Sequence, residues 1–253
     1  MLRIRHHLAP LIVVVGLLIA ADSTIRRRKG GEGGADVVII DPLAPLDLEG
    51  GFTARCVSLF ESAGFSTEVY MGSEVTVDRL KALSRGCAAI VFRVHSGVFQ
   101  DRVWFFTGER YDDTIHVAEQ LAYEVHIART SPDTDLLFAV GAKFVRRYMA
   151  GRLGGALVIL MGCDGLASED LAEAFVDAGA SAYVSWDGPV SLPHTDEATL
   201  ALIEGMASEG ACLGDAVERS RRLVGDDETY ESSLAIFPDE GALAALRGNK
   251  KAS

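Results

Sequence analysis

Residues 156–161 read ALVILM, and this run of six apolar side chains is the most hydrophobic in the body of the chain. Gly155 precedes the run and Gly162 follows it. A short apolar run bounded in this way is typical of a strand that is buried on both faces, as in a parallel sheet. Two further runs have the same character, DVVIID at 36–41 and AAIVFRV at 88–94. We therefore predict a parallel sheet that includes these three strands.

Segments with a helical spacing of apolar residues separate these runs from one another. The expected helices cover residues 50–64, 77–83, 168–178, 194–208 and 212–223. The other expected strands cover residues 66–70, 182–186 and, as a final edge strand, 230–237. Strands that alternate with helices predict an α/β fold with a six-stranded, mostly parallel sheet covered by helices on both faces.

The stretch between residues 103 and 149 does not follow this alternation of buried strands and helices. Residues 103–106 and 110–111 flank Thr107-Gly108-Glu109, a pattern that indicates a hairpin turn. Residues 115–128 and 136–149 are expected to be helical. His116 and His126 then lie on a polar helix and are interpreted as surface residues.

An uninterrupted apolar run, LAPLIVVVGLLIAA at 8–21, lies near the amino terminus. It is shorter than the roughly 17–25 residues of most spanning helices, but the basic cluster at 26–29 behaves as a stop-transfer signal. We expect one N-terminal hydrophobic helix that anchors the chain in a membrane, although a secretory signal segment or a buried helix is the alternative. The basic residues after the run outnumber Arg3 and Arg5 before it and favour a cytoplasmic body.

The expected organisation therefore has four parts. These are a membrane anchor or signal segment with its basic flank (1–29), a glycine-rich linker (30–35), one globular domain (36–240) and a C-terminal tail (241–253).

The charge of the body argues against one class of partner. The 253 residues carry 24 basic and 36 acidic side chains, and residues 1–29 hold six of the bases and one of the acids. Residues 30–253 are left with 18 bases and 35 acids, a net charge of −17. Such a body repels nucleic acid, and nucleic-acid binding is not expected.

The four cysteines give no sign of a disulfide framework or a metal site. Cys56, Cys87, Cys163 and Cys212 are scattered, form no CxxC pair and have no ligand-like spacing to histidine. Three of them lie among apolar neighbours and are interpreted as core residues, whereas Cys163 follows the 156–161 strand directly. No metal or organic cofactor is predicted.

Two strand ends carry residues that can do chemistry. The 88–94 strand is followed by His95-Ser96-Gly97, and the 156–161 strand by Gly162-Cys163-Asp164-Gly165. Ligands bind at the carboxyl ends of the strands in open α/β sheets, so an imidazole there can take the proton of the thiol. Gly97 permits close approach to a substrate, and its amide, with that of Cys163, can bind an oxyanion. Gly162 allows the sharp turn around the sulfur.

These motifs, IVFRVHSG at 90–97 and LVILMGCDG at 157–165, resemble those of the caspase-like cysteine peptidase superfamily. In its order of helices and strands, the stretch 171–222 is most similar to CHAT domains. The resemblance to the superfamily spans roughly residues 36–237. It implies a three-layer αβα sandwich with five parallel strands and a last antiparallel strand. It also implies a catalytic dyad of His95 and Cys163. The chain departs from the CHAT pattern in having Gly-Cys-Asp where Ala-Cys-Glu is usual.

The resemblance also suggests how a substrate side chain is recognised. Residues 183–187 read YVSWD, similar to the Tyr-x-Ser-Trp-Arg of caspases, in which the arginine binds an acidic substrate side chain. Asp187 stands in the place of that arginine and is expected to pair with Arg or Lys. Trp186 would wall the neighbouring subsite, and Asp164 is a second candidate for the basic side chain.

The resulting hypothesis is a cysteine endopeptidase that acts on a peptide or protein substrate, with cleavage after basic residues. One alternative is a catalytically silent module of the same fold that binds a partner. A less favoured alternative is a PfpI-like or amidotransferase-like hydrolase in which His194, downstream of the cysteine, is the base. The sequence does not indicate an oligomeric state.

Overall fold

The computed structural model describes residues 34–46, 51–83, 85–207 and 210–238. The expected anchor at 8–21, most of the linker and the tail at 241–253 lie outside these residues. Within the described part of the chain, no helix combines the length and the apolarity that crossing a membrane requires.

Six strands form the larger sheet, in the order β10-β9-β8-β3-β1-β2. Their bounds are β1 (Val37–Asp41), β2 (Thr67–Met71), β3 (Ala89–Phe92), β8 (Leu157–Leu160), β9 (Ala182–Trp186) and β10 (Leu234–Phe237). The first five are parallel, and β10 pairs antiparallel with β9. The predicted six-stranded, mostly parallel sheet is confirmed.

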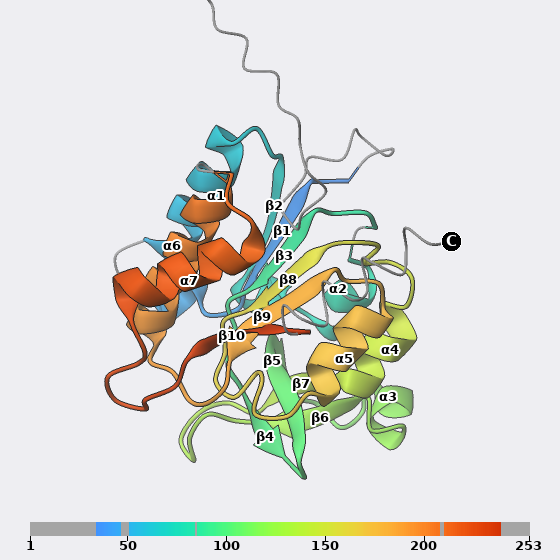
Figure 1. Cartoon of the computed structure of the whole chain (residues 1–253). Coiled ribbons are helices and arrows are strands. Elements are labelled where there is room, and N and C mark those ends of the chain that lie inside the picture. Colours follow the sequence, from blue (N-terminus) through green and yellow to red (C-terminus); the bar gives the residue numbers. More distant parts are fainter. Residues whose placement is uncertain (1–33, 47–50, 84, 208–209, 239–253) are drawn as a thin grey trace, which may run out of the picture.

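Helices cover both faces of this sheet (Figure 1). On one face lie α1 (Phe52–Ser62), α6 (Leu192–Ala207) and α7 (Leu213–Val224), and on the other α2 (Val77–Lys81), α4 (Ala142–Tyr148) and α5 (Asp170–Asp177). Successive side chains of a strand point to opposite faces, so each strand supplies two separate apolar cores. Val91 of β3 lies in the core under α1 and α6, and its neighbour Phe92 lies in the core under α4 and α5.

A second, four-stranded antiparallel sheet lies below the larger one in the view of Figure 1. Its order is β4-β5-β7-β6, with the bounds β4 (Ser96–Phe99), β5 (Arg102–Arg110), β6 (Val125–Ala128) and β7 (Leu137–Gly141). Phe105 and Phe138 from this sheet join the core under α4 and α5. The sequence did not predict this sheet, which is inserted between the strand that precedes His95 and the strand that precedes Cys163.

The prediction of a hairpin turn at Thr107-Gly108-Glu109 was wrong. The chain turns instead at Gln100 and Asp101, whose φ angles of 51° and 57° suit a two-residue turn between twisted strands. Strand β5 continues through Gly108, with a shift in its pairing with β7 between Phe106 and Arg110. A Cβ on Gly108 would lie 1.9 Å from the carbonyl oxygen of Gly72. Glycine is therefore needed here because the two backbone segments approach closely, and not because the chain turns.

The helices expected at 115–128 and 136–149 were too long. The first is a single turn, α3 (Val117–Leu121), followed by β6, and the second divides into β7 and α4. His116 and His126 therefore do not share a helix. The ring of His116 contacts Glu109 with 3.0 Å between Nε2 and Oε1, and that of His126 packs on Trp104. Neither histidine is the freely exposed residue that the sequence suggested.

Candidate active site

His95 and Cys163 lie in the loops that follow two neighbouring parallel strands, β3 and β8. In the pairing of β3 with β8, Phe92 is the partner of Leu160, an offset of 68 residues. The same offset separates His95 from Cys163, and each lies three residues beyond that last pair. The sheet continues the pairing by one further bond, 2.8 Å long, from the Met161 amide to the Phe92 carbonyl. The two predicted catalytic residues are thus brought together at the carboxyl edge.

Ser96 and Gly162 tie the two loops together. The Ser96 hydroxyl donates a 2.6 Å hydrogen bond to the Cys163 carbonyl. A Cβ on Gly162 would lie 2.0 Å from the same hydroxyl oxygen, so only glycine fits between the loops. Gly162 therefore allows the two loops to approach closely, whereas the sequence indicated only that it allows a sharp turn around the sulfur. Gly97, at the start of β4, has nothing within 4 Å of where its Cβ would stand.

The thiol of Cys163 faces the segment that follows β9. Its Sγ lies 3.5 Å from the Val190 carbonyl, to which it can donate, and it accepts from the Val190 amide at 3.4 Å. Burial raises the pKa of the thiol above its ordinary value, and the negative charges of Asp164 and Asp227 act in the same direction, with the Val190 amide opposing them. In this conformation the sulfur is held as a protonated thiol at neutral pH.

The imidazole of His95 lines a cavity of about 210 Å³ on its other side. Pro42 and Leu43 from the loop after β1 form one wall, and Phe106 forms another, with its ring 6.1 Å from the imidazole. Burial lowers the pKa of His95 below its ordinary value. A neutral imidazole can accept a proton, so the residue is in the form that a general base requires.

The two side chains therefore lie in neighbouring loops but are engaged with different neighbours. The thiol contacts the β9 side and the imidazole faces the β1 side, and no hydrogen bond joins them among the described residues. The arrangement can support proton transfer from sulfur to imidazole only after a side-chain rotation.

Known proteins offer no assignment for this arrangement. No family model matches the chain, and no curated protein shows significant similarity to it.

The three residues expected to bind substrate occupy unlike environments. Asp164, half-buried beside the thiol at a φ of 58°, has a carboxylate without a hydrogen-bond or ion-pair partner among the described residues, and burial raises its pKa. Asp187 is exposed, and its Oδ1 accepts a 2.7 Å bond from the Ser233 amide. Trp186 is fully buried, and its indole N–H donates to the Thr195 hydroxyl at 2.9 Å. Its predicted role as a subsite wall does not fit this burial.

Sequence reasoning missed a buried ion-pair cluster behind the site. Arg93, 2% exposed and directly after β3, lies 3.3 Å from Asp41 at the end of β1 and 2.7 Å from Asp196 in α6. Asp41 is fully buried and also accepts a 2.6 Å bond from the Thr53 hydroxyl of α1. Charged residues are rarely buried unless they are paired. An arginine inside the apolar run 88–94 was thus a signal that could have revealed the cluster.

A second missed residue, Asp227, fixes the segment that covers the thiol. Its Oδ2 accepts bonds from the amide and the hydroxyl of Ser191, at 2.9 and 2.7 Å. Its Oδ1 accepts from the amides of Thr229 and Tyr230. Burial opposes ionisation of this carboxyl, but these bonds outweigh it and lower its pKa to about 2. Asp227 thereby holds Val190 in place against Cys163.

Other titratable groups do not form a rival site in the described part of the chain. His194 directs Nε2 to the Gly225 carbonyl at 3.1 Å and packs on Trp186, without a bond to Cys163. Burial, with the charge of Asp41 adding to it, raises the pKa of Cys56 to about 12, as expected for an inert core thiol. Among the described residues, no group of three His, Cys, Asp or Glu side chains is arranged to hold a metal ion.

Proposed function

We propose that this chain is a caspase-like cysteine endopeptidase with a dyad of His95 and Cys163. The observation that carries the proposal is that the two residues follow neighbouring parallel strands, β3 and β8, and that the Ser96 hydroxyl beside His95 bonds the Cys163 carbonyl. The histidine-before-cysteine order and the strand order, with one antiparallel strand next to β9, support the caspase-like assignment.

The proposed reaction begins with transfer of the Cys163 proton to the neutral His95 imidazole. The thiolate attacks the carbonyl carbon of the scissile amide, and the resulting oxyanion accepts bonds from the amides of Gly97 and Cys163. The imidazolium then gives its proton to the leaving amine, and a thioester remains on the sulfur. Water, deprotonated by His95, hydrolyses the thioester to a carboxylic acid and restores the thiol. No metal or organic cofactor takes part in these steps.

Catalysis on this scheme requires the thiol to leave Val190 and rotate toward His95. A thiol is a weak donor and a weak acceptor, so the rotation breaks only weak contacts of 3.4 and 3.5 Å with the amide and carbonyl of Val190. A substrate that displaces the segment after β9 would free the sulfur in the same step. Enzymes often complete their catalytic geometry in this way on substrate binding.

The proposed substrate presents a basic side chain near the scissile bond. Asp164 is the stronger candidate for its partner, because its carboxylate is unpaired, half-buried and close enough to Cys163 to influence the thiol. Burial strengthens a charge-assisted bond from Arg or Lys to such a group. Asp187 is a second candidate, with one carboxylate oxygen bonded to Ser233 and the other available.

A silent binding module is the second candidate function. The resting geometry favours it: the thiol is protonated and bonded to backbone, and the imidazole faces another cavity. On either function we propose that residues 8–21 tether the domain to a membrane, with the domain on the cytoplasmic side.

A peptide-library assay on the full-length chain separates these functions. We expect turnover of peptides with Arg or Lys before the scissile bond, and a fall of about 10³-fold or more with Cys163→Ala or His95→Ala. Cys212→Ala is the matched control, because this half-buried cysteine caps α7 and should leave turnover unchanged. Asp164→Asn should weaken the preference for basic residues more than Asp187→Asn does.

Three outcomes would each count against a part of this proposal. If the wild-type chain and both dyad variants are equally inert, also after limited proteolysis, the silent module is favoured. Cleavage only after acidic residues would refute the roles of the aspartates. Activity that depends on His194 and not on His95 would favour the PfpI-like alternative.

A further inference from the structure

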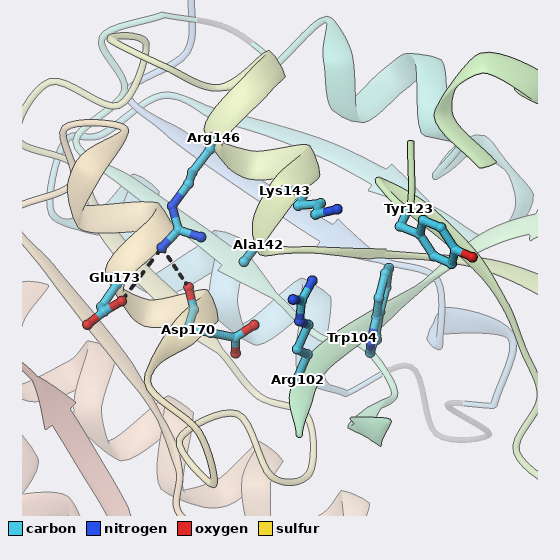
Figure 2. Close-up of a pocket in the computed structure, with 8 residues that line it drawn as sticks. All are labelled: Arg102, Trp104, Tyr123, Ala142, Lys143, Arg146, Asp170 and Glu173. Carbon is cyan, nitrogen blue, oxygen red and sulfur yellow. Dashed lines mark hydrogen bonds and ion pairs between the residues drawn. The ribbon is translucent and has the colours of Figure 1, made fainter. Parts of the chain in front are cut away.

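A cavity of about 280 Å³ lies away from the dyad, between the start of β5, α4 and α5 (Figure 2). Arg102 and Trp104 of β5 form one wall, Lys143 and Arg146 of α4 a second, and Asp170 of α5 a third. None of these residues has a role in the proposed peptidase. Basic side chains gathered around one hollow are unexpected on a chain with a net charge of −12.

One of the three basic residues is already neutralised. Arg146 directs Nε to Asp177 at 3.3 Å and a terminal nitrogen to Glu173 at 3.6 Å (Figure 2 shows the latter). The same guanidinium also donates to the Asp170 carbonyl at 3.4 Å. Arg146 and Glu173 therefore form part of the wall and leave little charge for a ligand.

Arg102 and Lys143 are different. Neither forms an ion pair among the described residues, and the Lys143 ammonium has only the Ala122 carbonyl, at 3.3 Å, and the face of the Tyr123 ring, at 5.6 Å. In Figure 2 the guanidinium of Arg102 rises into the space beneath α4, beside the indole of Trp104. The cavity thus offers two exposed cationic groups that pair with no carboxylate among the described residues.

The aromatic wall is rigid. The Trp104 indole N–H donates to the Phe99 carbonyl at 3.3 Å, and the ring packs against Gly141, where a Cβ would lie 3.1 Å from it. Any side chain at residue 141 would push the indole from this place. Tyr123 lines the cavity from the far side of Lys143 (Figure 2). Trp104 is 8% exposed, so a planar group that enters the cavity meets a small area of indole that is already in position.

The charge balance selects the ligand. Arg146 is offset by Glu173 and Asp177, so the charges left to face a ligand are those of Arg102, Lys143 and Asp170, a net of +1. One negative charge neutralises it, whereas a dianion meets repulsion from the Asp170 carboxylate. The planar guanidinium of Arg102 matches the two oxygens of a carboxylate. The volume is just below the roughly 300–1,000 Å³ of sites for drug-sized molecules and suits one ring with one acidic group.

We propose that this cavity binds a small aromatic monocarboxylate, with the carboxylate on Arg102 and Lys143 and the ring against Trp104. The site is independent of the proposed peptidase. It joins segments that extend from both dyad strands, because Trp104 pairs with Gly97 across the β4–β5 hairpin and Asp170 begins the helix that follows Cys163.

Tryptophan fluorescence provides the test on the full-length chain. The chain has two tryptophans, and Trp186 is fully buried, so a ligand in the cavity should change the emission of Trp104 alone. We expect benzoate to produce a saturable change that Trp104→Phe abolishes. Benzamide, which has the same shape without the charge, should bind about ten-fold or more weakly, because it forms no charge-assisted bonds. Phenyl phosphate should bind no more tightly than benzoate.

Variants separate the cavity from general surface charge. Arg102→Gln and Lys143→Gln should each weaken benzoate binding by about ten-fold. Arg110→Gln is the matched control, because this exposed arginine of the same strand pairs with Asp135 and should change affinity by less than about two-fold. Equal affinity for benzoate and benzamide, equal effects of the Arg102 and Arg110 variants, tighter binding of phenyl phosphate, or no saturation at tens of millimolar benzoate would each overturn the proposal.

Discussion

Replacement of Arg93 by methionine should destabilise the protein by about 3–5 kcal/mol, because it leaves buried carboxylates without their cation. Asp41 is 0% exposed and loses a contact of 3.3 Å, so it carries most of the cost. Asp196 keeps 20% of its side chain exposed, and solvent relieves part of the loss there. Methionine fills much of the arginine volume, so the effect reports the charge and not a cavity.

The measurement is urea unfolding of the full-length chain, followed by circular dichroism. The expected loss corresponds to a fall in Tm of about 6–20 °C for a domain of this size. Arg146→Met is the control, because its partners Asp177 and Glu173 are more than half exposed and such pairs contribute about 0–1 kcal/mol.

A second variant tests the reason for the loss. Combining Arg93→Met with Asp41→Asn removes the buried charge along with its partner, so the double variant should be more stable than Arg93→Met alone. The reasoning is refuted if Arg93→Met costs no more than Arg146→Met, or if the two substitutions are simply additive.

Three other predictions concern the loops at the sheet edge. Gly162→Ala would bring a Cβ within 2.0 Å of the Ser96 hydroxyl and should lower the free energy of unfolding by about 1–3 kcal/mol, measured by thermal unfolding. Gly97→Ala is the control and should leave this stability nearly unchanged, because nothing lies within 4 Å of the added Cβ. Equal losses for the two variants would contradict the close approach of the loops at Gly162. Burial raises the pKa of the Cys163 thiol, so iodoacetamide should alkylate Cys163 more slowly at pH 7 than it alkylates a cysteine peptide. The alkylation rate should still increase with pH above the ordinary thiol pKa. A rate already at its plateau at pH 7 would show a resting thiolate and contradict the prediction. Asp227 has a folded pKa of about 2, below the roughly 3.9 of an unfolded chain, so its contribution to stability is present above pH 4 and lost as the pH falls toward 2. Asp227→Asn should flatten this part of the Tm profile, and an unchanged slope between pH 4 and pH 2 would exclude the role.

Much of the larger sheet could be predicted because its strands are buried on both faces. A parallel strand between two helical layers is buried on both faces and is apolar at nearly every position, as are the runs at 36–41, 88–94 and 156–161. The alternation with helices then fixes the parallel direction of the strands through the handedness of the crossovers. These signals are local, so the sequence alone sufficed.

The smaller sheet could not be predicted because its signals are not local. Residues 137–141 read LFAVG, an apolar stretch that suits a helix as well as a strand, and it becomes β7 through pairing with β5 and β6. Gly108 looked like a turn residue, but its environment is set by Gly72, far away in the chain. Strand pairing and close approach depend on partners that no window of sequence contains.

The candidate active site also combines features that the sequence predicted with features that only the tertiary structure decided. The sequence determined that a histidine and a cysteine each follow a buried strand, because that depends only on the apolar runs before them. That these two strands are neighbours follows from the pairing of β3 with β8. The directions of the two side chains were decided by tertiary structure. Val190 and Asp227, both distant from Cys163 in the chain, hold the thiol on the β9 side, and the loop after β1 forms the cavity that receives the His95 ring. Backbone position follows from local pattern, whereas rotamer and protonation follow from the groups that packing brings near.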